Sequence, residues 1–214
     1  MIEVISGAAI SENPDRYAGL YRLRYEIFGG RLGWREVLRN NVDVDDYDRP
    51  DAVYIVVFSE DGTIVGTCRL LPTTDRYMLS EVFDFFLADQ EPPRDRKVWE
   101  LTRFGIKTEF IGKTSLSAFN EITSQLVYAL WRTCLDMDIE SLLAVVSLPI
   151  HRLVLRRLGC TPAWQSHSVK IDNIPALAIM YDVAPNILGQ LDRAEGFSPP
   201  VIHTALPVDL VKVA

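Results

Sequence analysis

The 214-residue sequence has few cysteines and no long apolar run, and each absence excludes a class of protein. Cys68, Cys134 and Cys160 lie far apart, without a CxxC pair or a histidine at a zinc-binding spacing. We therefore expect buried thiols in a reducing compartment. No stretch of 18 apolar residues occurs, and the first residues lack the basic start and apolar segment of a signal peptide. These features predict a cytoplasmic protein without a membrane span.

The sequence also lacks an excess of basic residues. Lys and Arg number 22 against 29 Asp and Glu, which gives a formal net charge of -7. Proteins that bind nucleic acid by neutralising phosphates need a basic surface. We therefore expect no nucleic-acid partner.

Two segments are close to known binding motifs but lack their spacing. Counting from Asp43, Tyr47 and Asp48 occupy the fifth and sixth places, where a calcium-binding EF-hand needs an oxygen ligand and a glycine. Gly105 and Gly112 are separated by six residues, whereas the Walker phosphate loop needs four. We therefore expect no metal site and no nucleoside triphosphatase.

The remaining composition is that of a globular protein, with 48% hydrophobic and 24% charged residues. We expect one domain over residues 1–214. The runs 53–58 and 64–71 flank an Asp-Gly turn and predict an antiparallel hairpin. Further strands are expected at 2–6, 98–104, 142–147, 160–168 and 176–183, and helices at 17–28, 77–87, 115–138, 149–158 and 185–194, before an apolar, proline-punctuated tail at 197–214. This order predicts an α+β fold with a largely antiparallel central sheet.

The segment Val98–Phe104 places an acid and a base inside an expected buried strand. Burying Glu100 and Arg103 costs free energy unless the charges are paired or functional. Regular alternation puts Glu100 and Thr102 on one face and Arg103 on the other, unless a β-bulge turns one side chain. Two functional charges and a structural ion pair are both open interpretations.

The helix expected at 17–28 carries Arg24 among aromatic residues. Its aliphatic stem either packs over these rings or presents a functional cation. Gly29 and Gly30 are expected to end the helix. Trp34 follows, either as a hydrophobic staple or as a ligand contact.

Two further sets of arginines stand out. Arg69 lies inside the second hairpin strand, where apolar residues are expected. Arg152 and Arg156 share one helix face at the i, i+4 spacing, either as a docking surface for an acidic partner or as an ordinary solvated face.

Taken together, these separated positions resemble the acyl-homoserine lactone synthases, the autoinducer synthases of quorum sensing. The resemblance is carried by the segments RLRYEIFGGRLGW, DDYD, GTCRLLP and WELTRF. Its motif positions are Arg24, Phe28, Trp34, Asp45, Asp48, Arg69, Glu100 and Arg103. The match extends from about residue 17 to 160 and is weaker beyond that point.

The resemblance implies a fold and a reaction. The fold is an α/β/α sandwich like that of the Gcn5-related N-acetyltransferases, with a mostly antiparallel sheet and a splayed strand pair that admits an acyl-pantetheine arm. The substrates are S-adenosylmethionine and an acyl thioester, carried by acyl carrier protein or coenzyme A. The amine attacks the thioester, and the carboxylate displaces methylthioadenosine to close the lactone. No cofactor is expected, because S-adenosylmethionine is consumed.

The donor expectation depends on a missing motif. Ordinary acetyltransferases of this fold carry a glycine-rich Q/R-x-x-G-x-G/A loop for the phosphates of coenzyme A, and this sequence lacks it. The absence favours acyl carrier protein without excluding coenzyme A.

The resemblance also implies roles for named residues. Glu100 is the candidate general base, in a catalytic pair with Arg103. Asp45 and Asp48 would hold the ammonium and sulfonium charges. Arg24 and Arg69, like Arg103, would hold the substrate carboxylate or fix the acids. The S-adenosylmethionine site would also include the apolar lid Phe28 and Trp34, and Phe104, near which a backbone N–H would stabilise the oxyanion.

The acyl chain and its carrier would use a second group of residues. The acyl pocket is expected to be lined by Leu101, Phe104, Leu142, Val145, Val146 and Ser147. The Ser147 hydroxyl lies near the position that bears on acceptance of a 3-oxo group. Arg152 and Arg156 are the candidate docking surface for an acidic carrier protein.

Two other functions fit parts of this pattern. An N-acetyltransferase that uses acetyl-coenzyme A would share the fold, but the missing phosphate loop and the filled motif positions disfavour it. A non-catalytic module that binds a carrier protein or S-adenosylmethionine would tolerate loss of Glu100. The presence of every polar position expected of the enzyme disfavours that function too.

Overall fold

A central sheet organises the computed structural model, which describes residues 1–31, 41–107, 121–152, 160–171, 173–193 and 197–211. Among these residues the strand order is β6-β8-β5-β4-β3-β2-β1-β9, with β7 paired to β8. The strands are β1 (Ile2–Ser6), β2 (Val53–Phe58), β3 (Ile64–Pro72), β4 (Val98–Ile106), β5 (Ser141–Ser147), β6 (Pro162–Gln165), β7 (Val169–Ile171), β8 (Ile174–Asp182) and β9 (Ile202–Ala205). The pairs β4–β5 and β1–β9 are parallel, and the other described pairs are antiparallel. The predicted mostly antiparallel sheet is confirmed.

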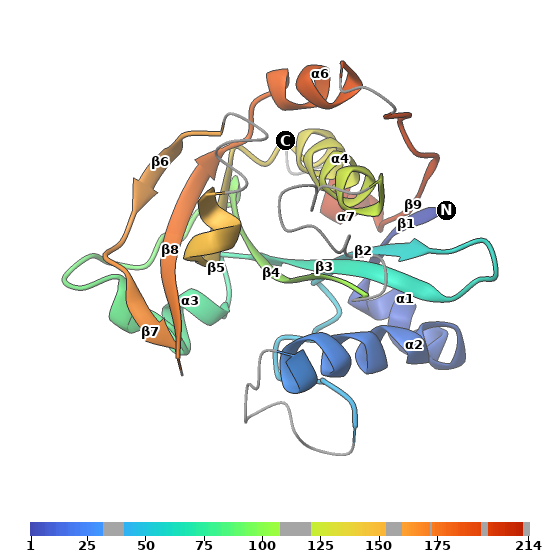
Figure 1. The fold of residues 1–214 in the computed structure, drawn as a ribbon, viewed down its shortest axis with the longest axis horizontal. Helices are drawn as coiled ribbons and strands as arrows, with labels where there is room; N and C mark the ends of the chain where they lie inside the picture. The colour runs from blue at the N-terminus through green and yellow to red at the C-terminus, as the bar shows by residue number, and fades with distance from the viewer. Residues whose placement is uncertain (32–40, 108–120, 153–159, 172, 194–196, 212–214) are drawn as a thin grey trace.

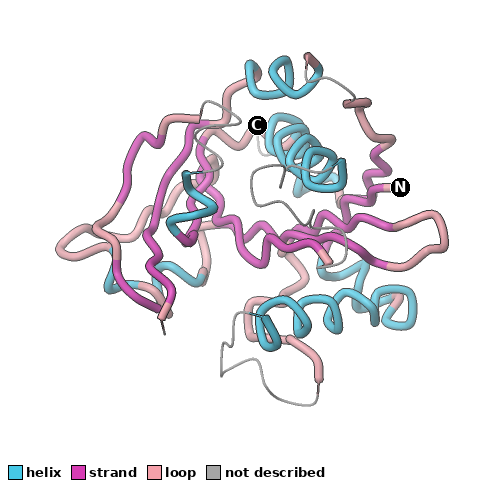
Figure 2. Tube along the Cα trace, in the orientation of Figure 1, coloured by secondary structure: helices cyan, strands magenta, loops and turns pink. Residues whose placement is uncertain are grey.

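Helices cover both faces of this sheet (Figures 1 and 2). They are α1 (Gly7–Glu12), α2 (Pro14–Arg24), a π-helix (Tyr25–Arg31), α3 (Met78–Glu81), a 3-10 turn (Asp84–Phe86), α4 (Glu121–Asp136), α6 (Asn186–Asp192) and α7 (Val208–Val211). In Figure 1, α2 lies below the strands β2 and β3, and α4 lies above them. The predicted α/β/α sandwich is therefore confirmed.

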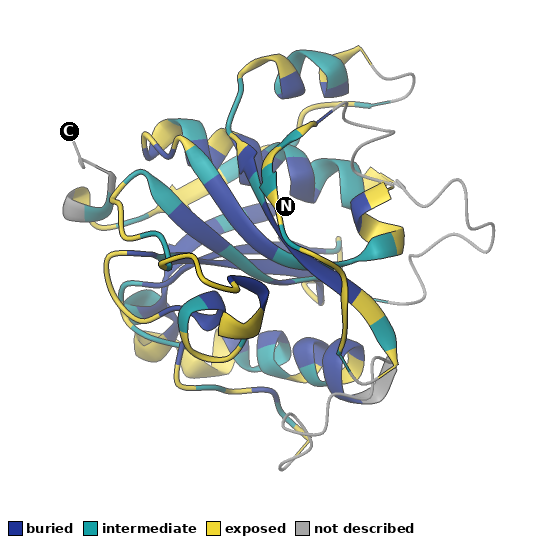
Figure 3. Ribbon diagram, turned by 90° about the vertical axis from the view of Figure 1, so that its left-hand side faces the viewer, coloured by how far each residue is buried: buried dark blue, intermediate teal, exposed yellow. Residues whose placement is uncertain are grey.

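Side-chain alternation divides the apolar residues of the sheet between these two helices. Tyr54 and Val56 of β2 join the cluster that contains Leu20 and Leu23 of α2. Ile55 and Val57 join the opposite cluster, which contains residues of α4 such as Leu130. Every residue of β2 is consequently buried. Figure 3 shows that the strands in the middle of the molecule are largely dark blue, which marks buried residues. Burial on both faces makes the centre of the sheet a rigid platform for side chains from the strands β2 to β4.

The strands β4 and β5 separate along their length. They pair from Val98↔Ser141 to Leu101↔Ala144. Beyond that point β4 continues to Ile106 and β5 to Ser147 with no further pair between them in the described residues. Figure 1 shows the two strands diverging. The predicted splayed strand pair is present.

A β-bulge interrupts the β3–β4 ladder within this splayed region. Thr67 pairs with Gly105 and Arg69 pairs with Thr102, so that Arg103 and Phe104 together oppose one residue of β3. Arg103 has a φ of 51°, a left-handed conformation that is rare for a bulky side chain. A bulge bends its strand and turns the side chains that follow.

The prediction that Gly29 and Gly30 end the second helix is wrong. The chain continues from α2 as a π-helix to Arg31. Glycine weakens a helix by only about 1 kcal/mol, which packing can offset. Here Ile27 and Phe28 are buried, and their side chains approach Gly105 so closely that an added Cβ there would lie 2.7 Å from Ile27. The helix α1 was not predicted either. Ser6 caps its start, because the Ser6 hydroxyl accepts the Ala9 N–H.

The C-terminal part differs from the prediction in two ways. Of the strand expected at 160–168, β6 occupies only Pro162–Gln165, and a separate strand that was not expected, β7, follows it and pairs with a different part of β8. The tail forms the strand β9, which pairs with β1, and the helix α7. Both differences arise from non-local pairing, which local periodicity does not encode.

Two of the expected helices lie partly outside the described residues. Of the helix expected at 115–138, α4 occupies Glu121–Asp136, and 115–120 lie outside the described residues. Of the helix expected at 149–158, residues 148–152 are helical, and 153–159 lie outside the described residues.

Candidate active site

A row of polar side chains crosses three neighbouring strands on the sheet face that α2 covers. Tyr54 of β2 pairs with Arg69 of β3, which pairs with Thr102 of β4. The Arg69 Nε donates to the Thr102 Oγ1 at 3.0 Å. Two pairs further along, and therefore on the same face, Leu71 opposes Glu100. Because residues in register share a face, the ladder brings Glu100 close to the polar row.

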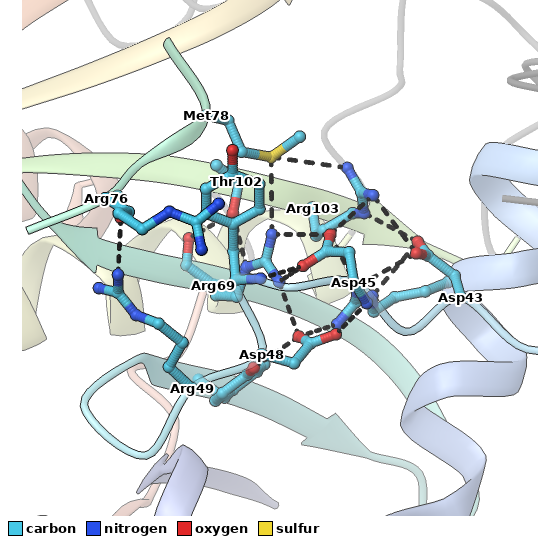
Figure 4. A network of polar contacts seen from close by, with 12 residues as sticks. Asp43, Asp45, Asp48, Arg49, Arg69, Arg76, Met78, Thr102 and Arg103 are labelled. Atoms are coloured by element: carbon cyan, nitrogen blue, oxygen red, sulfur yellow. Dashed lines mark hydrogen bonds and ion pairs between the residues drawn. The ribbon is translucent and has the colours of Figure 1, made fainter. Parts of the chain in front are cut away.

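The acidic segment between the π-helix and β2 folds onto its own backbone. The Asp45 N–H donates to the Asp48 Oδ2 at 2.8 Å, and the Tyr47 N–H donates to the Asp45 Oδ1 at 2.9 Å. Aspartates commonly bind backbone two or three residues away in such turns. These bonds fix the orientation of both carboxylates, which point toward the sheet (Figure 4).

Three arginines and three aspartates form one buried network (Figure 4). The six residues are Arg24, Arg69, Arg103, Asp43, Asp45 and Asp48. Their formal charges sum to zero. The three guanidinium side chains are 6% exposed or less. Pairing offsets the cost of removing such charges from water, and breaking it would leave a buried charge uncompensated.

Each guanidinium bridges two or more carboxylates. Arg24 donates to Asp48 at 2.6 Å and to Asp43 at 3.2 and 3.3 Å. Arg69 donates to Asp45 at 2.6 Å and to Asp48 at 2.7 Å. Arg103 donates to Asp43 at 2.8 Å and to Asp45 at 2.9 Å. The forked geometry of arginine suits this bridging, which a lysine would not reproduce.

The bulge accounts for the position of Arg103 in this network. Regular alternation would place Arg103 on the face opposite Glu100. Instead its guanidinium reaches Asp43 and lies 5.2 Å from the centre of the Phe28 ring, on the face that α2 covers. Glu100 and Arg103 therefore lie on the same face of the sheet because the strand is irregular.

Asp43 is a member of this network that the sequence did not predict. It is 2% exposed and binds both Arg24 and Arg103. It lies in the same acidic segment as Asp45 and Asp48, but the motif positions gave no reason to choose it. Its burial, beside α2, comes from the tertiary structure: its backbone N–H donates to the Tyr21 carbonyl at 3.0 Å.

The three aspartates differ in their access to solvent. Asp43 and Asp48 side chains are 2% and 4% exposed, whereas that of Asp45 is 20% exposed. The pKa of Asp48 is held well below its usual value: burial alone would raise it, but the charges of Arg24 and Arg69 outweigh that effect. The pKa of Asp45 is likewise lowered, because Arg69 outweighs burial. Asp45 is thus an ionised carboxylate and the most exposed of the three.

Glu100 lies against the start of α3. It is 1% exposed, and its two carboxylate oxygens accept the backbone N–H groups of Met78 and Leu79, each at 2.7 Å. Burial raises the pKa of Glu100 to about 7, although these hydrogen bonds and the charges of Arg69 and Arg103 favour the ionised form. A carboxyl group that titrates near neutral pH is suited to proton transfer.

Met78 links Glu100 to the network. Its Sδ lies 3.5 Å from the Arg69 Nη2 and 3.9 Å from the Arg103 Nη1 (Figure 4). Its backbone N–H binds Glu100. Glu100 therefore binds the backbone of the residue whose side chain packs against two of the three guanidiniums.

The structure does not bring all predicted pocket residues together. Leu101, Phe104 and Val146 pack in the cluster on the α4 side, where Leu142 is buried. Val145 packs in the cluster on the α2 side. Ser147 alternates with Val146 along β5 and so shares a face with Val145.

Four other positions that were predicted to be functional can be compared with the structure. Trp34 and Arg156 lie outside the described residues. Arg152 is exposed, and the adjacent His151 Nδ1 lies 2.9 Å from the Tyr181 hydroxyl of β8. Arg24 is 0% exposed within the network, so its guanidinium does not reach solvent over the neighbouring rings. 

Cys68, Cys134 and Cys160 are buried thiols, and burial raises the pKa of each. Among the described helices, none is long and apolar enough to cross a membrane. In the same part of the chain, no group of three or more His, Cys, Asp or Glu side chains is placed to hold a metal ion.

Comparison with known proteins connects this geometry to a family. A family model described as autoinducer synthase matches residues 10–187. An acyl-homoserine-lactone synthase of Aeromonas hydrophila is 35% identical over 153 residues, which cover 72% of this chain and 72% of the relative. One from Aliivibrio fischeri is 37% identical over 145 residues, which cover 66% and 72%.

Comparison with solved structures points to the same family. The coenzyme A-dependent acyl-homoserine lactone synthase BjaI, with S-adenosylmethionine and isopentyl-CoA, has a TM-score of 0.81 at 28% identity, covering 99% of this chain and 96% of that one. An N-acetyltransferase from Lactobacillus plantarum has a TM-score of 0.56 at 16% identity, covering 86% and 99%, which shows the shared fold alone. The chain belongs to the autoinducer synthase family, the acyltransferases that make acyl-homoserine lactones.

Proposed function

We propose that the chain transfers an acyl group from an acyl thioester to the amine of S-adenosylmethionine, closes the lactone and releases methylthioadenosine as it makes a quorum-sensing signal. The observation that carries this proposal is the buried arginine–aspartate network beside the splayed strands β4 and β5. The network supplies charged groups for a zwitterionic substrate. The splay supplies a place for an extended acyl-pantetheine arm.

In this proposal Asp45 binds the ammonium group of S-adenosylmethionine. It is the most exposed carboxylate of the network, and it is ionised because Arg69 outweighs the effect of burial on its pKa. Asp43 and Asp48 hold the guanidiniums in place. Phe28, whose ring already faces the Arg103 guanidinium, contributes an apolar wall with Trp34.

Glu100 is the proposed general base. The ammonium group must lose a proton before the nitrogen can attack the thioester, and a carboxylate with a pKa of about 7 can accept it directly or through one water. The oxygens of Glu100 are held by two backbone N–H groups, so their orientation is fixed. We assign stabilisation of the thioester oxyanion to the backbone N–H of Phe104, at the bulge that interrupts the β3–β4 ladder.

The proposal leaves two candidate carriers for the acyl group, acyl carrier protein and coenzyme A. The missing glycine-rich phosphate loop favours acyl carrier protein, whose acidic surface suits the exposed Arg152. The likeness to the coenzyme A-dependent BjaI favours coenzyme A. Both donors present a thioester on pantetheine, so the same splay between β4 and β5 would admit either one.

Mass spectrometry tests the proposed function. Purified protein is incubated with S-adenosylmethionine and either acyl carrier protein or coenzyme A thioesters of several chain lengths. We expect an acyl-homoserine lactone together with methylthioadenosine, and the donor that gives the higher kcat/KM identifies the carrier. An N-acetylated product without lactone would favour the acetyltransferase alternative. Absence of lactone with every thioester donor would reject the proposal.

A further inference from the structure

We infer that Tyr54 is a positioning residue for the S-adenosylmethionine site and acts through Asp48. The inference rests on the proposed function of the network. Tyr54 is 0% exposed, and its hydroxyl donates to the Asp48 Oδ1 at 2.6 Å. The sequence did not single out Tyr54, because a tyrosine in the run VYIVVF is also typical of a buried strand.

Register explains why Tyr54 reaches this carboxylate. Tyr54 and Arg69 are direct partners in the β2–β3 ladder, so their side chains leave the sheet side by side on one face. Both groups bind the same oxygen of Asp48, Arg69 at 2.7 Å and Tyr54 at 2.6 Å. The sheet therefore anchors Asp48 from two adjacent strands.

The surroundings of Asp48 leave it a single orientation. Its Oδ1 also accepts the Arg24 Nη1 at 2.6 Å, and its Oδ2 accepts the Asp45 N–H at 2.8 Å. Four donors from four separate segments thus bind one carboxylate. Rotation of this carboxylate would break the bond to the backbone of Asp45, the residue that we propose to contact substrate.

Tyrosine supplies this fourth donor without adding a charge. The network holds three guanidiniums and three carboxylates, so a lysine at position 54 would upset the balance. Burial and the negative charge of Asp48 raise the pKa of Tyr54 well above its usual value, so the hydroxyl stays a donor over the working pH range. A phenylalanine would fill the same space but leave Asp48 with one donor fewer.

A double-mutant cycle tests the inference. The KM for S-adenosylmethionine is measured for wild type, Tyr54→Phe, Asp48→Asn and the double variant. We expect Tyr54→Phe to raise this KM about tenfold, the factor for losing one hydrogen bond to a charged group, with the KM for the acyl donor unchanged. In the Asp48→Asn background the same substitution should have little further effect. Equal effects in both backgrounds would overturn the inference.

Tyr17→Phe is the matched control. Tyr17 is also a buried tyrosine that donates to a carboxylate, the Glu3 Oε2 at 3.0 Å, but Glu3 is not part of the network. We expect this variant to keep both KM values. If Asp48→Asn does not fold, the Tyr54→Phe result alone decides. A tenfold rise confined to S-adenosylmethionine supports the inference, whereas no rise, or equal rises for both substrates, contradicts it. Lactone production by the wild type tests the proposed function separately.

Discussion

Asp45 and Asp48 are joined through the backbone, because the Asp45 N–H donates to the Asp48 Oδ2 at 2.8 Å. The Arg69 Nη1 lies 2.6 Å from one carboxylate and 2.7 Å from the other. Nevertheless, the Asp45 side chain is 20% exposed and the Asp48 side chain is only 4% exposed. The two aspartates thus form one unit with a solvent-facing member and a buried member, and their removal should have different consequences.

Substitution of each aspartate by asparagine should separate binding from stability. We expect Asp45→Asn to raise the KM for S-adenosylmethionine by about tenfold or more, because a charged contact is lost. Asp48→Asn should lower the free energy of unfolding by about 3–5 kcal/mol, because two buried guanidiniums lose a partner. Steady-state kinetics and chemical denaturation measure the two effects. A larger loss of stability in Asp45→Asn than in Asp48→Asn would contradict the assignment.

Glu100→Gln should abolish most turnover while S-adenosylmethionine still binds. Loss of a general base reduces kcat by about 100-fold or more. The amide would also set a donor against the N–H groups of Met78 and Leu79, so stability should fall by about 1–3 kcal/mol. Calorimetric binding and single-turnover assays give the two quantities. The matched control is Glu140→Gln, at the exposed position that directly precedes β5. A near-wild-type rate in Glu100→Gln would exclude Glu100 as the base.

The pH dependence of activity should report the same carboxyl group. Because the pKa of Glu100 is raised to about 7, kcat/KM should rise about tenfold per pH unit below 7 and level off above it. The residual activity of Glu100→Gln should lack this inflection. A wild-type profile that is flat between pH 6 and 8 would show that another group accepts the proton.

Stability should change with pH in the opposite direction. A folded pKa of about 7 against an ordinary value of 4.5 means that folded Glu100 binds a proton more tightly than unfolded Glu100. Its contribution is therefore complete below pH 4.5 and is lost as the pH rises to 7, a change of up to about 3 kcal/mol. Denaturation at pH 5 and pH 8 should show a larger stability difference between wild type and Glu100→Gln at pH 5. An equal difference at both values would contradict the raised pKa.

Two neighbouring valines of β5 should affect the acyl chain differently. Val146 packs with Leu101 and Phe104 on the α4 side, and Val145 packs on the α2 side. If the acyl chain enters the α4 side of the splay, Val146→Phe should shift the preference to shorter chains by about tenfold or more per methylene. Val145→Phe is the matched control and should keep the preference. Competition between donors of different length measures the chain-length preference. A shift in Val145→Phe alone would place the acyl chain on the α2 side of the splay.

Charge reversal tests the docking surface. If Arg152 and Arg156 receive an acidic carrier protein, changing both to glutamate should raise the KM for the acylated carrier several-fold and leave that for S-adenosylmethionine unchanged. Arg22→Glu, at an exposed position on α2, is the control. Unchanged carrier kinetics in the double variant would remove this surface from consideration.

Much of the site could be predicted from local features of the chain. The β-rich runs around the Asp-Gly turn specify the hairpin of β2 and β3, and charged residues in expected strands indicate that Arg69, Glu100 and Arg103 are not ordinary surface residues. The separated motifs specify the family because they combine residues that only a common site would require. These features depend on residue type and short-range spacing, which the sequence contains directly.

Other features were decided by the tertiary structure. The Arg103 side chain joins Glu100 only because a bulge in β4 breaks the alternation, and its partner Asp43 is 60 residues away. Tyr54 reaches Asp48 only because the β2–β3 register places it beside Arg69. By itself the sequence determined that Arg69, Glu100 and Arg103, which lie within expected strands, are buried charges that need partners. The choice of partners required the folded sheet, since the energy of a buried charge depends on groups brought close by strand pairing rather than on neighbours in the chain.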